Sequence, residues 1–147
     1  MQQERFKVVP FVSLILKQGS RVLLIRRKNT GVEDGMYGCA GGGVDEHEQV
    51  AQAVIREAAE ELGIIIKKEH IRVAHILHRR YPHGAEMIGF YIEALEWQGE
   101  PRNMEPDKCD DIKWFDMDQL PANCQPSFKQ VVTMLDKGAF FSEMGWE

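Results

Sequence analysis

The stretch Gly41–Ile64, GGGVDEHEQVAQAVIREAAEELGI, joins a glycine-rich turn to one acidic helix. Asp45 is the predicted N-cap of this helix, with Glu48 three residues later as its capping-box partner. Gly63 is the predicted stop, because glycine readily adopts the left-handed conformation found after a helix. Between these residues, apolar side chains recur at helical spacing at Val50, Val54, Ile55, Ala58 and Leu62. The pattern predicts an amphipathic helix with one buried face.

Three glutamates of this helix, Glu57, Glu60 and Glu61, are spaced i, i+3 and i+4, so their side chains converge. Glu57 and Glu61 flank the apolar face, whereas Arg56 projects toward the solvent side. An acidic run is commonly a solvated helix face, but like charges at this spacing repel, and no lysine follows at i+4. Carboxylates beside a core need a compensating cation. Because oxygen-only ligands suit a hard divalent ion, the three glutamates predict a site for Mg²⁺ or Mn²⁺.

The glycine and charged positions of the stretch match a known signature. Gly42, Glu48 and the run REAAEELGI at 56–64 resemble the Nudix box, which is the signature of the Nudix hydrolases. Two positions depart from that pattern: Ala58 stands where a larger aliphatic residue is usual, and His47 stands where many members have glycine. Neither departure removes a ligand.

The resemblance implies roles for several residues of the box. The backbone carbonyl of Gly41 is expected to join Glu57, Glu60 and Glu61 as a ligand of Mg²⁺. Arg56 lies about two helical turns after Glu48, so we expect these two side chains to pair if the preceding turn folds over the helix. The pair would then position Glu57 without contacting phosphate.

Three further candidates lie outside the box. Arg27 ends a predicted strand, where a cation serves either solubility or, as in MutT-like members, a contact with substrate. The loop WQGEPRNMEPDK at 97–108 resembles a MutT-type loop and places Glu105 as an extra metal ligand or general base, the alternative being a surface acid. Asn123, in LPAN, resembles a base-reading asparagine, although asparagine also favours turns. Whether Glu57 or Glu105 is the base stays open.

The rest of the chain predicts a sheet flanked by helices. Strands are expected at 8–16, 21–27, 36–40, 71–79, 87–97 and 112–115, with another beginning at 64–66, and a second helix at 126–137. Strands surrounding two helices indicate an α/β/α sandwich with a mixed sheet, formed by a single domain at 1–147. The resemblance implies the same architecture, the Nudix fold.

Composition limits the class of protein. The chain is 44% hydrophobic and 28% charged, as is typical of a soluble globular protein. A net charge of −5 argues against binding a nucleic acid polymer, although it permits a single nucleotide. The start, MQQERFK, has no apolar signal core, and no stretch is long enough to span a membrane. Cys39, Cys109 and Cys124 show no CxxC spacing and are expected to be free thiols in the cytoplasm.

The sequence therefore predicts a Mg²⁺-dependent hydrolase that cleaves a nucleoside diphosphate linked to another group. The MutT-like loops favour a (deoxy)nucleoside triphosphate cut to NMP and pyrophosphate, although Gly43 stands where MutT has a lysine. The alternatives are a dinucleoside polyphosphate hydrolase, toward which Tyr81 points, or a nucleotide-sugar hydrolase. The extended motif of NADH-cleaving members is absent. A non-catalytic nucleotide-binding module and an isomerase using Cys39 are the rivals from other classes. The oligomeric state stays open.

Overall fold

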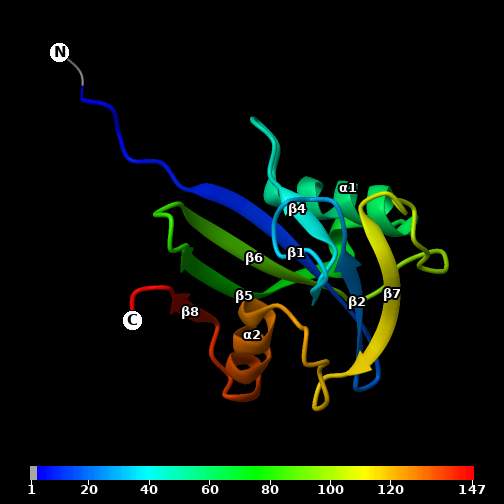
Figure 1. The fold of residues 1–147 in the computed structure, drawn as a ribbon. Helices are drawn as coiled ribbons and strands as arrows, with labels where there is room; N and C mark the ends of the chain where they lie inside the picture. Colours follow the sequence, from blue (N-terminus) through cyan, green and yellow to red (C-terminus); the bar gives the residue numbers. More distant parts are fainter. Residues whose placement is uncertain (1–2) are drawn as a thin grey trace.

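The computed structural model describes residues 3–147, so the first two residues, which belong to the expected domain 1–147, lie outside the described part. In chain order the elements are β1 (Val9–Gln18), β2 (Arg21–Arg27), β3 (Tyr37–Gly38), β4 (Gly41–Gly43), α1 (Val50–Leu62), the 3₁₀ helix η1 (Lys68–His70), β5 (Ile71–Arg80), β6 (Glu86–Ala94), β7 (Cys109–Asp116), α2 (Pro126–Asp136) and β8 (Phe141–Met144) (Figure 1). No helix of this part is long and apolar enough to cross a bilayer.

The strands form a mixed sheet in the order β3-β2-β1-β6-β5-β8, with β4 paired to β1 and β7 paired to β2. Strand β1 runs parallel to β6 and antiparallel to β4. Strands β1 and β2 pair only beside their hairpin, at Lys17–Val22 and Gln18–Arg21, and then diverge. On its other edge β2 pairs with β7 along its whole length, from Arg21 to Arg27 (Figure 1). This divergence opens a gap between β1 and β2 that is important for the functional site.

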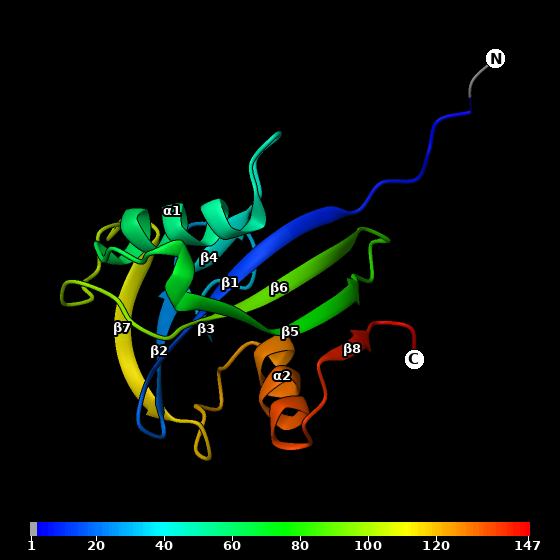
Figure 2. The same ribbon diagram turned by 180° about the vertical axis from the view of Figure 1, so that it is seen from behind.

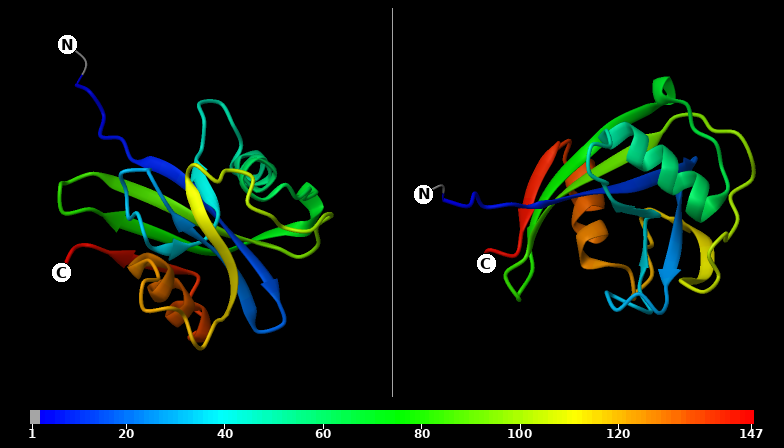
Figure 3. Two further views of the ribbon diagram at one scale, coloured as in Figure 1. Left: turned by 45° about the vertical axis from the view of Figure 1, so that its right-hand side comes forward. Right: turned by 90° about the horizontal axis from the view of Figure 1, so that it is seen from above.

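Helices α1 and α2 cover opposite faces of the sheet (Figure 3). Alternate residues of β1 point to opposite faces, so β1 contributes side chains to the core under each helix. Val12, Leu14 and Leu16 pack in one cluster with the apolar face of α1. Ile15 packs in a second cluster with Phe128 of α2. The predicted α/β/α sandwich with a mixed sheet is therefore confirmed.

The start of α1 differs from the prediction. The helix begins at Val50 with Gln49 as N-cap, and the Gln52 side chain accepts the Gln49 N–H at 3.2 Å. Asp45 is not the N-cap, because His47 has φ 65° and a right-handed helix cannot continue through that conformation. The stop is as predicted, since Gly63 has φ 67°.

Several other boundaries also differ. Gly41–Gly43 is a strand, β4, and not a turn. The predicted strand at 64–66 is reduced to one bridge, between Ile65 and Gln98. Strand β7 begins at Cys109, three residues earlier than expected, because β2 offers it a full-length partner. Strand β8 was not predicted, and it extends the sheet along β5.

Candidate active site

A cleft of about 410 Å³ opens where β1 and β2 diverge, beside α1 and β4. Its charged lining residues are Arg27, Glu57, Glu60, Glu61, Glu105 and Lys108. The strand β2 supplies Arg27, α1 supplies three glutamates, and the loop at 97–108 supplies the last two residues. The structure therefore gathers all the predicted carboxylate ligands and Arg27 in one cleft, with Gly41 at its wall.

Two glycines of β4 permit close contacts, Gly42 with α1 and Gly41 with β1. The Gly41 N–H donates to Glu61 Oε2 at 2.7 Å. A Cβ on Gly42 would overlap the Glu57 carboxylate, and a Cβ on Gly41 would overlap the backbone oxygen of Val12. The glycine-rich stretch is thus needed for proximity, because no Gly of β4 has a positive φ.

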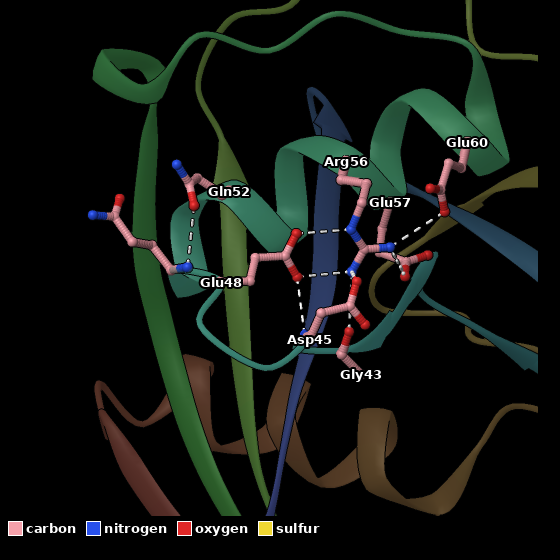
Figure 4. A network of polar contacts seen from close by, with 8 residues as sticks. Gly43, Asp45, Glu48, Gln52, Arg56, Glu57 and Glu60 are labelled. Carbon is pink, nitrogen blue, oxygen red and sulfur yellow. Dashed lines mark hydrogen bonds and ion pairs between the residues drawn. The ribbon is translucent and has the colours of Figure 1, made fainter.

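Arg56 organises the acidic side chains around it, as Figure 4 shows. Its Nε and Nη2 donate to the two carboxylate oxygens of Glu48 at 2.8 and 2.9 Å, which is the expected pair. Its Nη1 donates to Glu57 Oε1 at 2.8 Å and to Glu60 Oε2 at 3.3 Å. No lysine follows these glutamates, and we expected them to have no cationic partner; that expectation is wrong, because Arg56 pairs with Glu57 next to it and with Glu60 one turn later.

The acids of the cleft have shifted pKa values. Burial, and then the charge of Glu57, raise the pKa of Glu61 to about 8. Burial also raises the pKa of Glu57, against the opposing effect of Arg56. Outside the cleft, hydrogen bonds from Arg56 hold the pKa of Glu48 at about 2. The charge of Glu105 contributes to raising the pKa of both Glu57 and Glu61, so the cleft has an excess of negative charge.

The carboxylates have the chemistry that suits a hard cation, although their side chains do not converge around a single point in this structure. In residues 3–147 no three acidic, histidine or cysteine side chains stand ready to hold a metal ion. One oxygen of Glu57 is bonded to Arg56, and one oxygen of Glu61 is bonded to the Gly41 N–H. Each of these two carboxylates keeps a second oxygen for a metal ion, and Glu60 and Glu105 add further carboxylate oxygens. An oxygen-only donor set with excess negative charge suits Mg²⁺.

The cations of the cleft come from loops or strand ends. Arg27 donates through Nε to the Val32 carbonyl at 2.8 Å, which leaves both terminal nitrogens for a ligand. Lys108, with no ion pair to any residue in 3–147, lines the same cleft. Lys108 was not predicted from the sequence. Its place three residues after Glu105, in the same loop, was the available signal that it lies near the cleft.

Asn123 does not line this cleft. The side-chain Nδ2 of Asn123 donates to the Gly35 carbonyl at 2.9 Å, and the backbone carbonyl of Asn123 accepts the Tyr37 N–H at 2.8 Å. The side chain therefore holds a turn in this structure. Two residues slightly later in the chain, Gln125 and Ser127, line a second cleft instead.

This second cleft, of about 540 Å³, adjoins the first and shares Phe11 and Arg27 with it. One wall carries an ion pair in which Arg79 Nη1 lies 3.1 Å from Glu33 Oε1. The guanidinium of Arg79 also lies 4.3 Å from the ring centre of Tyr81. The other oxygen, Glu33 Oε2, is buried without a hydrogen-bond partner in the described chain. The wall thus combines charged groups with an aromatic ring.

Comparisons with known proteins find relatives of this chain in sequence and in structure. The NUDIX domain model matches residues 7–135. The NAD-capped RNA hydrolase NudC of Pseudomonas aeruginosa is 29% identical over 115 residues, which are 78% of this chain and 38% of that protein. The chain thus spans about two fifths of the length of that curated relative. The ADP-ribose pyrophosphatase of Methanocaldococcus jannaschii is 30% identical over 124 residues, 82% of this chain and 70% of that protein.

Among solved structures, the MutT NUDIX hydrolase from Burkholderia pseudomallei superposes with a TM-score of 0.80 and 29% identity, covering 87% of this chain and 98% of that one. The chain belongs to the Nudix hydrolase family. Within that family it is similar to MutT Nudix hydrolases in fold and to NudC proteins in sequence.

Proposed function

We propose that this protein is a Mg²⁺-dependent pyrophosphohydrolase that cleaves a nucleoside diphosphate linked to another group, with water attacking phosphorus. The observation that carries the proposal is the acidic cleft, where four glutamates meet Arg27 and Lys108. Diphosphate linkages resist hydrolysis because their negative oxygens repel a nucleophile. A cleft that gathers carboxylates for a divalent cation and two cations for phosphates is suited to overcome that repulsion.

Each residue of the cleft has a proposed role. Glu57, Glu60 and Glu61, with the Gly41 carbonyl, would hold Mg²⁺, which when bound neutralises phosphate charge and acidifies a water. Arg56 and Glu48 fix Glu57. Arg27 and Lys108 bind phosphate oxygens. Glu105, whose carboxylate has no bond within residues 3–147, takes the proton of the attacking water, a role that contributes roughly 10² to 10⁴ in rate. Glu57 is the alternative base.

The favoured substrate is a (deoxy)nucleoside triphosphate, converted to NMP and pyrophosphate. The likeness to a MutT Nudix hydrolase over nearly its full length supports this choice. With the triphosphate in the acidic cleft, the adjoining second cleft has room for the nucleoside. Gly43 stands where MutT has a lysine, and Lys108 supplies a cation to the cleft in place of that lysine.

A second candidate is a nucleoside diphosphate sugar such as ADP-ribose. The 30% identity to an ADP-ribose pyrophosphatase favours it specifically. The NudC relatives add NAD-capped RNA to the substrates to be tested. We retain a free nucleotide as the expected partner because the net charge of −5 disfavours a polyanion. A cytoplasmic location belongs to the same proposal, since Cys39, Cys109 and Cys124 are all unpaired.

The test is a panel of nucleoside triphosphates, dinucleoside polyphosphates, nucleotide sugars, ADP-ribose and NAD-capped RNA, each with Mg²⁺ and with a chelator. Nucleotide products are separated by chromatography, and phosphate release is measured with and without added inorganic pyrophosphatase. Phosphate that appears only with pyrophosphatase identifies a triphosphate giving pyrophosphate. Hydrolysis of ADP-ribose alone would select the second candidate, and no hydrolysis of any member would contradict the proposed function.

A further inference from the structure

The loop that carries Glu105 is anchored on both sides. The Arg102 N–H donates to the Leu62 carbonyl at 3.0 Å, and the Met104 N–H donates to the Glu61 carbonyl at 3.1 Å. These acceptors are among the last carbonyls of α1, which lack intrahelical partners. Figure 2 shows the loop lying along the end of that helix. After Glu105 the chain is tied to the end of β2, because the Lys108 carbonyl accepts an N–H from residue 28 at 2.9 Å.

Inside the loop, the side chain of Asn103 holds the backbone at Glu105. Asn103 Oδ1 accepts the Glu105 N–H at 3.0 Å, and Asn103 Nδ2 donates to the Cys109 carbonyl at 2.7 Å. The Glu105 carbonyl in turn accepts the N–H groups of Lys108 and Cys109, both at 2.9 Å. The amide of Glu105 is therefore fixed by one side chain, which also links it to the first residue of β7.

The carboxylate of Glu105 has no such support. It lines the acidic cleft with Glu57 and Glu61 but makes no hydrogen bond or ion pair with any residue in 3–147. Neighbouring glutamates repel it, and neither Arg27 nor Lys108 of the same cleft forms an ion pair with it. Its direction consequently depends on its own backbone, and that backbone depends on Asn103.

We infer that Asn103 is a positioning residue that aims the Glu105 carboxylate into the acidic cleft. The inference rests on the proposed role of Glu105. Removal of the Asn103 side chain frees the Glu105 amide while the helix-anchored bonds at Arg102 and Met104 remain. Because reacting groups must be placed to within about 1 Å, the expected loss of kcat is roughly tenfold to a hundredfold, with KM within about twofold of wild type.

The test is a double-mutant cycle with Asn103→Ala, Glu105→Gln and the double variant. If Asn103 acts through Glu105, Asn103→Ala lowers kcat in the wild-type background and changes it by less than about twofold in the Glu105→Gln background. Met104→Ala is the matched control, because its side chain belongs to the same loop and is 43% exposed. It should leave kcat within about twofold of wild type.

A second readout does not depend on turnover. In the metal-free protein, amide hydrogen exchange of Glu105 should accelerate by about tenfold or more in Asn103→Ala and stay unchanged in Met104→Ala. Wild-type kcat in Asn103→Ala, equal losses in both backgrounds, or unchanged exchange at Glu105 would each overturn the inference alone. Wild-type kcat in Glu105→Gln would instead overturn the proposed role of Glu105, and the inference with it.

Discussion

One glycine, Gly42, determines how closely α1 can approach β4. A Cβ at Gly42 would occupy the position of the Glu57 carboxylate, whereas a Cβ at Gly43 would meet nothing within 4 Å. The displaced atoms belong to the end of a flexible side chain, so the fold can absorb the change but Glu57 cannot keep its place. Neighbouring glycines in one strand therefore have different sensitivities.

Gly42→Ala should lower kcat by roughly tenfold to a hundredfold, because it moves Glu57 away from Arg56 and from the metal site. The melting temperature should change by only a few degrees. Gly43→Ala is the matched control and should keep wild-type kinetics. Steady-state kinetics and thermal melts of the two variants make the comparison. Equal kinetic losses at both positions would show that β4 tolerates no side chain, for reasons unrelated to Glu57.

Glu48 is the residue whose ionisation should matter most clearly for stability in acid. Its pKa is about 2 in the folded protein, against an ordinary value of 4.5, so the folded state favours the charged form. The stabilisation is fully present above about pH 4.5 and is lost as the pH falls toward 2. The stability difference between wild type and Glu48→Gln should therefore narrow between pH 5 and 2, as measured by urea unfolding. A constant difference would contradict the assignment of the low pKa.

At the scale of elements, α1 and the segment before it act as one unit joined by Arg56. Its guanidinium spans from Glu48 in the preceding turn to Glu57 and Glu60 on the helix. It also donates to the Gly43 carbonyl at 3.2 Å, which ties the unit to β4. A planar fork with several donors is required for that set of partners.

Arg56→Lys keeps the charge but loses the fork, so it should lower kcat about tenfold or more with a smaller effect on KM. Steady-state kinetics on the substrate identified by the panel would measure both parameters. The expected pattern is that of a residue that positions Glu57 without touching phosphate. A large rise in KM at unchanged kcat would show a direct contact with substrate instead.

The box could be predicted from sequence because its chemistry is local to one helix. The convergence of Glu57 and Glu61 and the stop at Gly63 follow from helical spacing and glycine conformation. The start at Val50 could not be predicted, since Glu48 is used by Arg56 and His47 adopts a left-handed φ. Those facts depend on how the preceding turn folds over the helix.

For the whole molecule, the decisive feature is the divergence of β1 from β2. It places Phe11 and Arg27 where the two clefts meet. It also brings β7 and its loop, with Glu105 and Lys108, to the end of α1. These relations are long-range, so sequence patterns revealed Glu105 only through resemblance and gave no sign of the second cleft. Asn123, identified by the same resemblance, holds a turn instead of lining the cleft.

We expect the carboxylates of α1 to bind a divalent cation on which hydrolysis depends. The most direct measurement is a Mn²⁺ titration followed by electron paramagnetic resonance, in parallel with Mg²⁺-dependent hydrolysis, for wild type, Glu60→Gln and Glu69→Gln. Glu69 is an exposed acid of η1 and serves as the control. If Glu60 is a ligand, Glu60→Gln weakens metal binding about tenfold or more and lowers turnover, with the fold intact, while Glu69→Gln matches wild type. A Glu60→Gln protein that titrates like wild type, or hydrolysis that persists in a chelator, would contradict it.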